Sequence, residues 1–232
     1  TLSVQSVVCT RILMAKRTGI ILLSGGLDST TLLWDYRDEI ALAVSFDYGS
    51  KHNAREIAMA RYQADSAGVE HIVIPLDFMA KYFRSDLLKN GGAIPQEAYT
   101  EASIASTVVP FRNGIMLSIV AGLAESRGLD KLFIANHAGD HAIYPDCREE
   151  FILPMTSAIR EGTCNHVEVM APYTLITKTD ILSRGHALGV DYAHTYSCYT
   201  GGDRHCGTCA TCRERKEAFL VAGVADPTRY EA

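Results

Sequence analysis

The chain has 232 residues, of which 47% are hydrophobic and 21% are charged. These values lie close to the averages for soluble globular domains, and they exclude a disordered, collagen-like or coiled-coil chain. Because 22 lysines and arginines stand against 27 aspartates and glutamates, the net charge is −5, which argues against nucleic acid or an anionic membrane as a partner. The length allows one substantial domain with a small appendage, and no apolar run reaches the roughly 18 residues that a membrane-spanning helix needs.

The cysteine content indicates a reducing compartment. The chain has seven cysteines, an odd number, and four of them lie within fifteen residues near the C-terminus. This clustering is typical of a metal site rather than of a disulfide framework. We therefore expect a cytoplasmic protein.

Apolar runs and helix-breaking residues alternate along the chain and predict strands and helices in turn. Residues 1–15 precede this pattern and are interpreted as an N-terminal extension, because Met14 is a natural start. Strands are predicted over residues 20–23, 40–46, 71–75, 131–135 and 167–171. Helices are predicted after Asp28-Ser29-Thr30, which resembles an N-cap, and over 54–67, 113–127, 146–159, 178–188 and 210–221. After Asp77 the pattern dissolves, and residues 89–107 are predicted to form a long surface loop over a binding site.

This alternation predicts an α/β fold, with a doubly wound, mostly parallel sheet that carries helices on both faces. In such folds, ligands bind at the carboxyl ends of the strands near the topological switch point. Polar residues that follow Leu23, Phe46 and Ala135 should therefore converge on one site.

The first of these strand exits, Ser24-Gly25-Gly26-Leu27-Asp28-Ser29-Thr30, joins a strand to a helix through two glycines. Such a loop directs free backbone N–H groups and the positive end of the helix dipole at an anion, so a phosphate is expected there. Asp28 would repel a phosphate unless a divalent cation lay between them, and we therefore predict Mg²⁺. For a bare pair of glycines, a tight turn with a good N-cap is the simpler interpretation.

The complete string resembles the PP-loop of the ATP pyrophosphatases. It lacks the Gly-Lys-Ser/Thr of a Walker A loop, so a kinase or P-loop NTPase is not indicated. The resemblance implies a fold like that of the adenine nucleotide alpha hydrolases and an enzyme that cleaves ATP between the α and β phosphates, passing AMP to a substrate oxygen.

Four cysteines near the C-terminus, Cys198, Cys206, Cys209 and Cys212, have the spacing C-x7-C-x2-C-x2-C. Four thiolates can surround a tetrahedral Zn²⁺ with no open position for water, which predicts a structural site. An iron–sulfur cluster, a redox pair, or His205 in place of one thiol are the alternatives. We expect residues 16–192 to form a nucleotide-binding α/β domain and residues 193–232 to form a small zinc-binding helical region.

Further polar residues lie at strand and helix ends. Lys51 and His52 follow the second strand, where a lysine can stabilise phosphate charge and a histidine can bind phosphate or move a proton, although a solvated pair is at least as simple an interpretation. Arg112 precedes an apolar helix and can either clamp a carboxylate or phosphate or lie exposed at the helix start. The segment after Ala135 is dense in polar residues and favours a ligand site: His137, Asp140, His141, Tyr144, Asp146 and Arg148.

Taken in order over about residues 16–222, the chain's strings resemble those of the 7-cyano-7-deazaguanine synthases: SGGLDSTT, FDYGSKH, VPFRN, DHAIYPDCR and the four cysteines. That family makes the nitrile precursor of queuosine from 7-carboxy-7-deazaguanine, ammonia and ATP, and it is typically a zinc-containing homodimer. The resemblance implies the same reaction here through an adenylated intermediate, with the four cysteines as zinc ligands. It also implies an ATP-binding segment that comprises Leu23, Ser24, Gly25, Gly26, Leu27, Asp28, Ser29, Thr30, Thr31, Leu32 and Leu33. One departure is Phe111, where a glycine is common.

The predicted site follows from this resemblance and from the strand exits. The predicted catalytic residues are Asp28, Lys51, His52 and Arg112. The predicted substrate-binding residues are Arg112, Asn113, Asp140, Tyr144, Asp146 and Arg148. The alternatives are another PP-loop adenylating ligase, acting on tRNA or on protein, or a zinc- and nucleotide-binding module without catalysis. The acidic charge balance counts against direct modification of tRNA.

Overall fold

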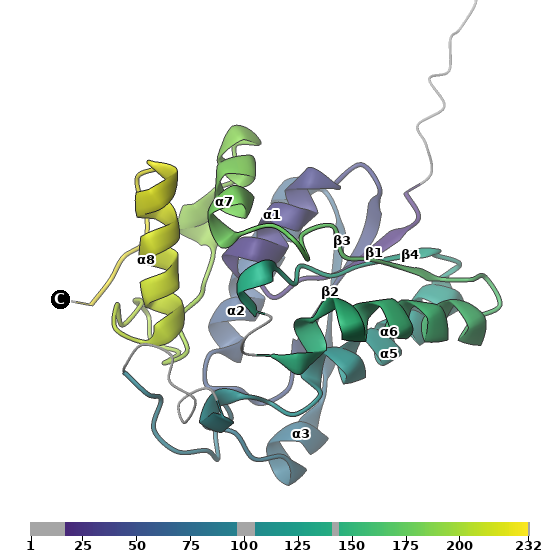
Figure 1. The fold of residues 1–232 in the computed structure, drawn as a ribbon, viewed down its shortest axis with the longest axis horizontal. Coiled ribbons are helices and arrows are strands. Elements are labelled where there is room, and N and C mark those ends of the chain that lie inside the picture. Colours follow the sequence, from purple (N-terminus) through teal and green to yellow (C-terminus); the bar gives the residue numbers. More distant parts are fainter. Residues whose placement is uncertain (1–16, 97–104, 141–143, 232) are drawn as a thin grey trace, which may run out of the picture.

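The computed structural model describes residues 17–96, 105–140 and 144–231. It contains a five-stranded parallel sheet in the order β3-β2-β1-β4-β5, and helices cover both of its faces (Figure 1). The strands are β1 (Gly19–Leu22), β2 (Ile40–Asp47), β3 (Glu70–Pro75), β4 (Lys131–Phe133) and β5 (Glu168–Met170). Because the order runs outward from β1 in both directions, the sheet is doubly wound and its topological switch point lies between β1 and β4. The predicted fold class and all five predicted strands are confirmed.

Seven helices are delimited among the described residues. They are α1 (Leu27–Asp35), α2 (Asn53–Ala67), α3 (Asp77–Tyr82), α5 (Arg112–Arg127), α6 (Glu149–Gly162), α7 (Lys178–Ala187) and α8 (Ala210–Ala222). The sequence did not predict α3, because six residues are too few to show a helical period.

Two predicted helix starts were wrong. The N-cap of α1 is Gly26, which is extended, so Asp28, Ser29 and Thr30 lie in the first turn of the helix rather than before it. The helix predicted from residue 146 begins at Glu149, because Pro145–Cys147 form a separate 3-10 turn. The first correction places the predicted phosphate-binding residues on the helix itself.

The core has two halves because neighbouring residues of each strand point to opposite faces of the sheet. Ile20 packs with apolar residues of α5 and α6, whereas Ile21 packs with residues of α1, α2 and α7. Both isoleucines are fully buried. A sheet covered on both faces explains why the strands read as continuous apolar runs without alternation.

The C-terminal helix shares this core. Phe219 of α8 is 2% exposed and packs in the same cluster as Ile21. Arg215, also on α8, is 1% exposed, and its guanidinium donates hydrogen bonds to the Tyr192 carbonyl and to the Thr195 hydroxyl, both at 3.0 Å. The cysteine-rich segment is therefore attached to the α/β layers by a buried, hydrogen-bonded arginine.

The segment Ala105–Arg127 is long and apolar enough to cross a membrane by length and composition alone, and 44% of its most apolar window is buried. Its α5 part buries Leu117, Val120 and Ala124 in the core beside the sheet. A core helix of a globular domain has these same properties, so we interpret α5 as a core helix.

The predicted N-terminal extension, His141 and part of the predicted loop at 89–107 lie outside the described residues. In the described part of that loop, residues 105–107 are helical. The Gln96 carbonyl accepts a hydrogen bond from Arg213 Nη2 at 3.4 Å. This part of the loop therefore lies against the cysteine-rich segment.

Candidate active site

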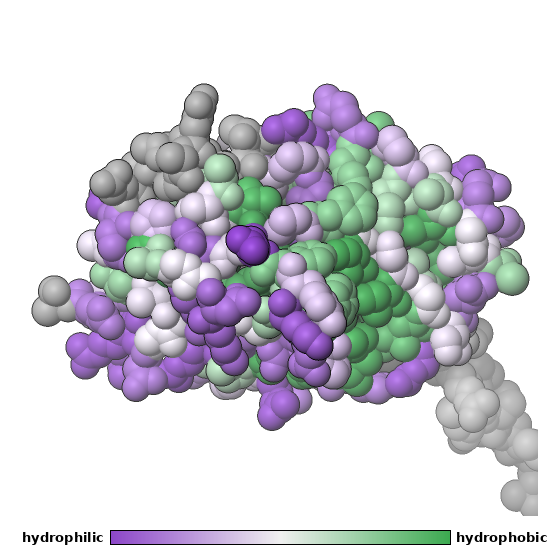
Figure 2. All heavy atoms as spheres, turned by 90° about the horizontal axis from the view of Figure 1, so that it is seen from below, coloured by the Kyte–Doolittle hydropathy of each residue, from purple (hydrophilic) through white to green (hydrophobic). Residues whose placement is uncertain are grey.

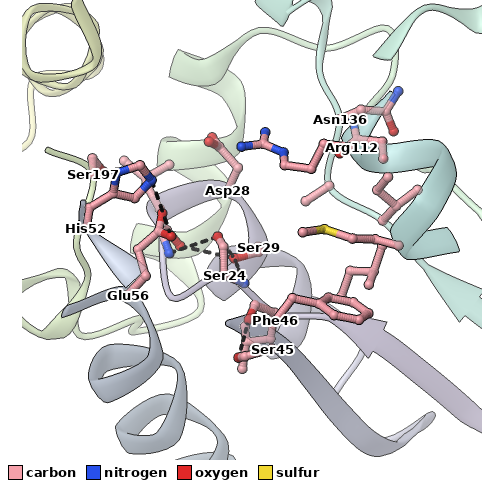
Figure 3. A pocket seen from close by; sticks show the side chains of 18 of the residues that line it. Ser24, Asp28, Ser29, Ser45, Phe46, His52, Glu56, Arg112, Asn136 and Ser197 are labelled. Carbon is pink, nitrogen blue, oxygen red and sulfur yellow. Dashed lines mark hydrogen bonds and ion pairs between the residues drawn. The ribbon is translucent and has the colours of Figure 1, made fainter. Parts of the chain in front are cut away.

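A cavity of about 250 Å³ opens at the carboxyl ends of β1, β2 and β4, and it is the centre of the predicted site (Figure 3). Its walls come from the three strand exits that the sequence singled out, and from α2, α5, α7, α8 and the cysteine-rich segment. Sequence-predicted residues that line it are Leu23, Ser24, Gly26, Leu27, Asp28, Ser29, His52, Arg112, Asn113, Asp140 and Tyr144. The predicted convergence of the strand exits is therefore confirmed.

The loop between β1 and α1 is shaped to receive an anion. The Ser24 and Ser29 hydroxyls are 2.9 Å apart, and the Gly26 N–H donates to Ser24 Oγ at 3.2 Å. No side chain caps the N-terminus of α1, so its first N–H groups are directed at the cavity without a capping partner. An uncapped helix start beside a cavity fits a phosphate.

Gly25 lets this loop lie against α2. It has a φ of +83°, which residues with a side chain rarely adopt, and a Cβ there would lie 2.2 Å from the carbonyl oxygen of Glu56. Gly25 therefore shapes the loop from behind and does not itself line the cavity.

Charged side chains surround the start of α1. Asp28 Oδ2 lies 3.7 Å from Lys178 Nζ and 3.9 Å from His137 Nε2, and Lys178 Nζ lies 3.1 Å from Glu214 Oε2. Burial opposes the charge of Lys178, but Asp28, Glu214 and Asp140 outweigh this effect and hold the Lys178 pKa above its ordinary value. The positively charged Lys178 side chain thus lies beside the start of α1, where it can neutralise phosphate charge.

The same region is rich in carboxylates. Burial raises the pKa of Asp140, against the charge of Lys178 and a 3.6 Å contact with His137. Asp28 Oδ1 is buried without a hydrogen-bond partner. Such a carboxylate beside a phosphate position is the kind of oxygen ligand that Mg²⁺ takes, so the residues present fit the predicted cation.

The opposite wall is formed by α2, α5 and the segment after β2. Arg112 Nη1 donates to the Tyr48 hydroxyl at 3.2 Å. His52 is 3% exposed, and burial, helped by the charge of Arg112, lowers its pKa to about 4, so the imidazole is neutral. Glu56, one helical turn further along α2, has its pKa raised to about 8 by burial. This wall therefore presents one permanent cation among groups that are uncharged at neutral pH.

The residues predicted to bind substrate divide between the cavity and its supports. Asn113 lines the cavity, and its side chain donates to Cys147 Sγ at 3.1 Å. Asp146 lies behind it, where its carboxylate accepts the Asn113 backbone N–H at 2.8 Å and so caps the start of α5. The Tyr144 hydroxyl lies 2.8 Å from that of Tyr199.

Several predicted residues are not brought to the cavity. Lys51 Nζ donates to the backbone carbonyls of Asp86 and Gly92, which fits a structural role rather than the predicted catalytic one. Arg148 lies at the N-cap of α6. The other predicted residues that do not line the cavity belong to the loop before α1, to the buried face of α1 or to the cap of α5: Gly25, Thr30, Thr31, Leu32, Leu33 and Asp146.

Sequence reasoning missed several residues that line the cavity: Glu56, Asn136, Lys178, Ser197, Tyr199 and Glu214. Asn136 directly follows the strand run that ends at Ala135, so the expectation that polar residues after strands converge on the site could have found it. Its Oδ1 is buried without a hydrogen-bond partner. Lys178 follows Thr177, whose capping box with Asp180 marks a helix start after a strand. Glu56 and Glu214 lie inside helices, where no local pattern distinguishes them.

The four cysteines form the predicted cluster. Their Sγ atoms all lie within 4.8 Å of one another, and none of them forms a disulfide. Backbone N–H groups of Thr200 and Cys206 donate to Cys198 Sγ at 3.4 and 3.3 Å, as is usual around metal-bound thiolates. His205 Nε2 accepts the Ser197 N–H at 3.0 Å, so His205 is not a ligand in this arrangement. The donor set fits a closed tetrahedral zinc site.

The chain is similar to several known proteins. The family model described as "Queuosine biosynthesis protein QueC" matches residues 18–223. A 7-cyano-7-deazaguanine synthase of Porphyromonas gingivalis is 62% identical over 216 residues, which are 93% of this chain and 98% of the relative. One of Desulfotalea psychrophila is 47% identical, covering 91% and 97%. Among solved structures, the NMN synthetase of Francisella tularensis matches with a TM-score of 0.48 and 12% identity over 90% of this chain and 78% of that chain. The chain belongs to the QueC family of queuosine biosynthesis proteins.

Proposed function

We propose that the chain is an ATP-dependent ligase that converts 7-carboxy-7-deazaguanine and ammonia to 7-cyano-7-deazaguanine in queuosine biosynthesis. The observation that carries this is one cavity that joins the uncapped start of α1 to a wall bearing Arg112. The first suits the phosphates of ATP, and the second suits a carboxylate. The two reacting groups of the proposed reaction can thus meet in one cavity.

A carboxylate is a poor acyl donor because its leaving group would be oxide. In the proposed sequence, the 7-carboxylate attacks the α-phosphate of ATP and pyrophosphate leaves. Ammonia then displaces AMP from the acyl adenylate to give an amide. The amide oxygen then attacks the α-phosphate of a second ATP, and pyrophosphate leaves. The nitrogen loses its two protons and the C–O bond breaks, so the oxygen departs with AMP and the nitrile remains.

Particular residues support each part of this sequence. Amides at the start of α1, together with Ser24, Ser29 and Lys178, would hold the phosphates. Arg112 would hold the carboxylate, and Asp140 and Tyr144 would lie near the deazapurine. Asp28 would hold Mg²⁺, which supplies charge neutralisation on the phosphates when bound.

The proposal extends to the rest of the molecule. We propose that the four cysteines hold a structural Zn²⁺ and that the protein works in the cytoplasm. We also propose a homodimer, supported by apolar surface on the face where α5 and α6 lie (Figure 2). Phe111, the N-cap of α5, is 57% exposed, and Leu153 of α6 is 58% exposed.

The decisive experiment incubates the protein with ATP, Mg²⁺, ammonium and 7-carboxy-7-deazaguanine, and follows substrate mass and nucleotide products together. Formation of the nitrile with AMP supports both the substrate and the position of ATP cleavage. ADP as the sole nucleotide product would contradict the adenylate. Absence of turnover in folded, zinc-replete protein would favour a different acceptor or a role in binding alone.

A further inference from the structure

Glu56 is a buried carboxylate of the cavity wall that the steps above do not use. Its side chain is 18% exposed and extends from α2 into the cavity beside His52 (Figure 3). The backbone of α2 at the same residue touches the phosphate-binding loop, since a Cβ on Gly25 would meet the Glu56 carbonyl oxygen. The side chains of Glu56, Ser24 and Ser29 line the same cavity, so the carboxylate faces the space in which the proposed acyl adenylate forms (Figure 3).

The groups around Glu56 leave it as the proton acceptor of this wall. At the N-cap of α2, His52 Nε2 lies 3.6 Å from Glu56 Oε2, and the low pKa of His52 makes it a poor base. From α5 the permanent cation Arg112 opposes the effect of burial on the Glu56 pKa, and Glu56 itself raises the pKa of the Tyr48 phenol in the segment after β2. The cysteine-rich segment adds Tyr196 and Tyr199 to the same wall.

The proposed reaction needs such a group. In neutral solution ammonia is mostly ammonium, which has no lone pair with which to attack a carbonyl carbon. Burial raises the pKa of Glu56 to about 8, so its ionised form is a stronger proton acceptor than an exposed carboxylate, and this ionised form attracts the ammonium cation. Arg112 is committed to the substrate carboxylate and cannot take up a proton.

We propose that Glu56 binds ammonium and takes up its proton, so that ammonia attacks the acyl adenylate; this role rests on the proposed function. One N–H bond of ammonium breaks and its proton passes to the Glu56 carboxylate. The freed lone pair forms the C–N bond, the C–O bond to AMP breaks, and AMP leaves with that electron pair. A second proton leaves the nitrogen for water, and Glu56 returns its own proton to solvent.

Hydroxylamine distinguishes a role of Glu56 as proton acceptor from a role in substrate recognition, because hydroxylamine is largely uncharged at neutral pH and attacks acyl adenylates without a base. Glu56→Gln should lower kcat/KM for ammonium by about 100-fold or more, the usual contribution of a general base. Hydroxamate formation and the KM for the deazapurine should stay at wild-type values. The matched control is Asp65→Asn, which removes the same charge from an exposed position of α2 and should leave both reactions unchanged.

A pH profile tests the role in the wild type, and so remains decisive if the variant fails to fold in a thermal unfolding control. The kcat/KM for total ammonium should rise to about pH 8 and then level, whereas in Glu56→Gln it should follow the fraction of free ammonia. Equal loss of both reactions with a raised deazapurine KM would overturn the assignment and make Glu56 a recognition residue. Full ammonium turnover in the variant, or a wild-type profile that follows only free ammonia, would also overturn it. Wild-type protein that forms neither amide nor hydroxamate would refute the proposed function, and this assignment with it.

Discussion

Replacing Glu56 with glutamine should stabilise the free protein at alkaline pH. Burial raises the pKa of this carboxyl from its ordinary value of 4.5 to about 8. A carboxyl whose pKa rises on folding favours the folded state below its unfolded pKa, and this contribution is lost as the pH rises through the folded pKa. The loss should therefore occur between about pH 4.5 and pH 8. Glutamine does not ionise and escapes it.

The expected magnitude follows from the same pKa. At about 1.4 kcal/mol for each pH unit between the two pKa values, the upper limit is about 5 kcal/mol above pH 8. The side chain is 18% exposed, and the amide must still find hydrogen-bond partners, so we expect about 2 to 3 kcal/mol. In a chain of this length that corresponds to an increase in Tm of about 4 to 12 °C.

The assay is thermal unfolding of wild type, Glu56→Gln and the control Asp65→Asn in a series of buffers from pH 5 to pH 9. The difference in Tm between Glu56→Gln and wild type should be small at pH 5 and grow to its full value near pH 9, while Asp65→Asn shows no such trend. A difference that is the same at every pH, or a variant that is less stable than wild type at pH 9, would refute the reasoning. Agreement would mean that the protein is less stable at alkaline pH because it keeps the Glu56 carboxylate, the proposed proton acceptor, buried in the cavity wall.

Three other changes test the site. Asp28→Ala should abolish Mg²⁺-dependent turnover but keep one zinc per chain, measured by metal analysis, and full activity would refute the role of Asp28 in holding the cation. Gly25→Ala should place its Cβ against the backbone of α2 and reduce ATP affinity by at least about tenfold in calorimetry, since a strained loop of this kind costs on the order of 1 to 3 kcal/mol; wild-type affinity would contradict the close packing. Cys212→Ser should lose zinc and lower the Tm by at least about 5 °C, because a closed metal site contributes directly to folding, and an unchanged Tm would exclude a structural zinc.

The conformation of Phe111 is a feature that a single sequence does not reveal. Phe111 directly precedes α5, and its backbone lies in the left-handed region with a φ of +52°. A Cβ on Gly114 would lie only 2.4 Å from the Phe111 ring. The sequence marked this residue only as a departure from the family pattern. The left-handed backbone accounts for why glycine is common there, and the small neighbour Gly114 shows how this chain accommodates an aromatic ring.

The sequence by itself determined the fold class, the succession of strands and helices along the chain, and two local features, the glycine loop and the cysteine cluster. These features depend on residues close together in sequence: apolar runs, the loop at Ser24–Thr30 and the cysteine spacing that brings four Sγ atoms within 4.8 Å. Local signals of this kind are readable because the chain geometry fixes which neighbours can meet.

Only the tertiary structure decided which polar residues face the cavity. Lys51, which was predicted to act in catalysis, donates to two backbone carbonyls and does not line the cavity. Lys178 and Glu214, from α7 and α8, meet at 3.1 Å beside Asp28. The physical reason is that a side chain's direction and burial depend on elements that pack against it from far along the sequence. The same packing gives Glu56 its raised pKa, which no pattern in the sequence of α2 records.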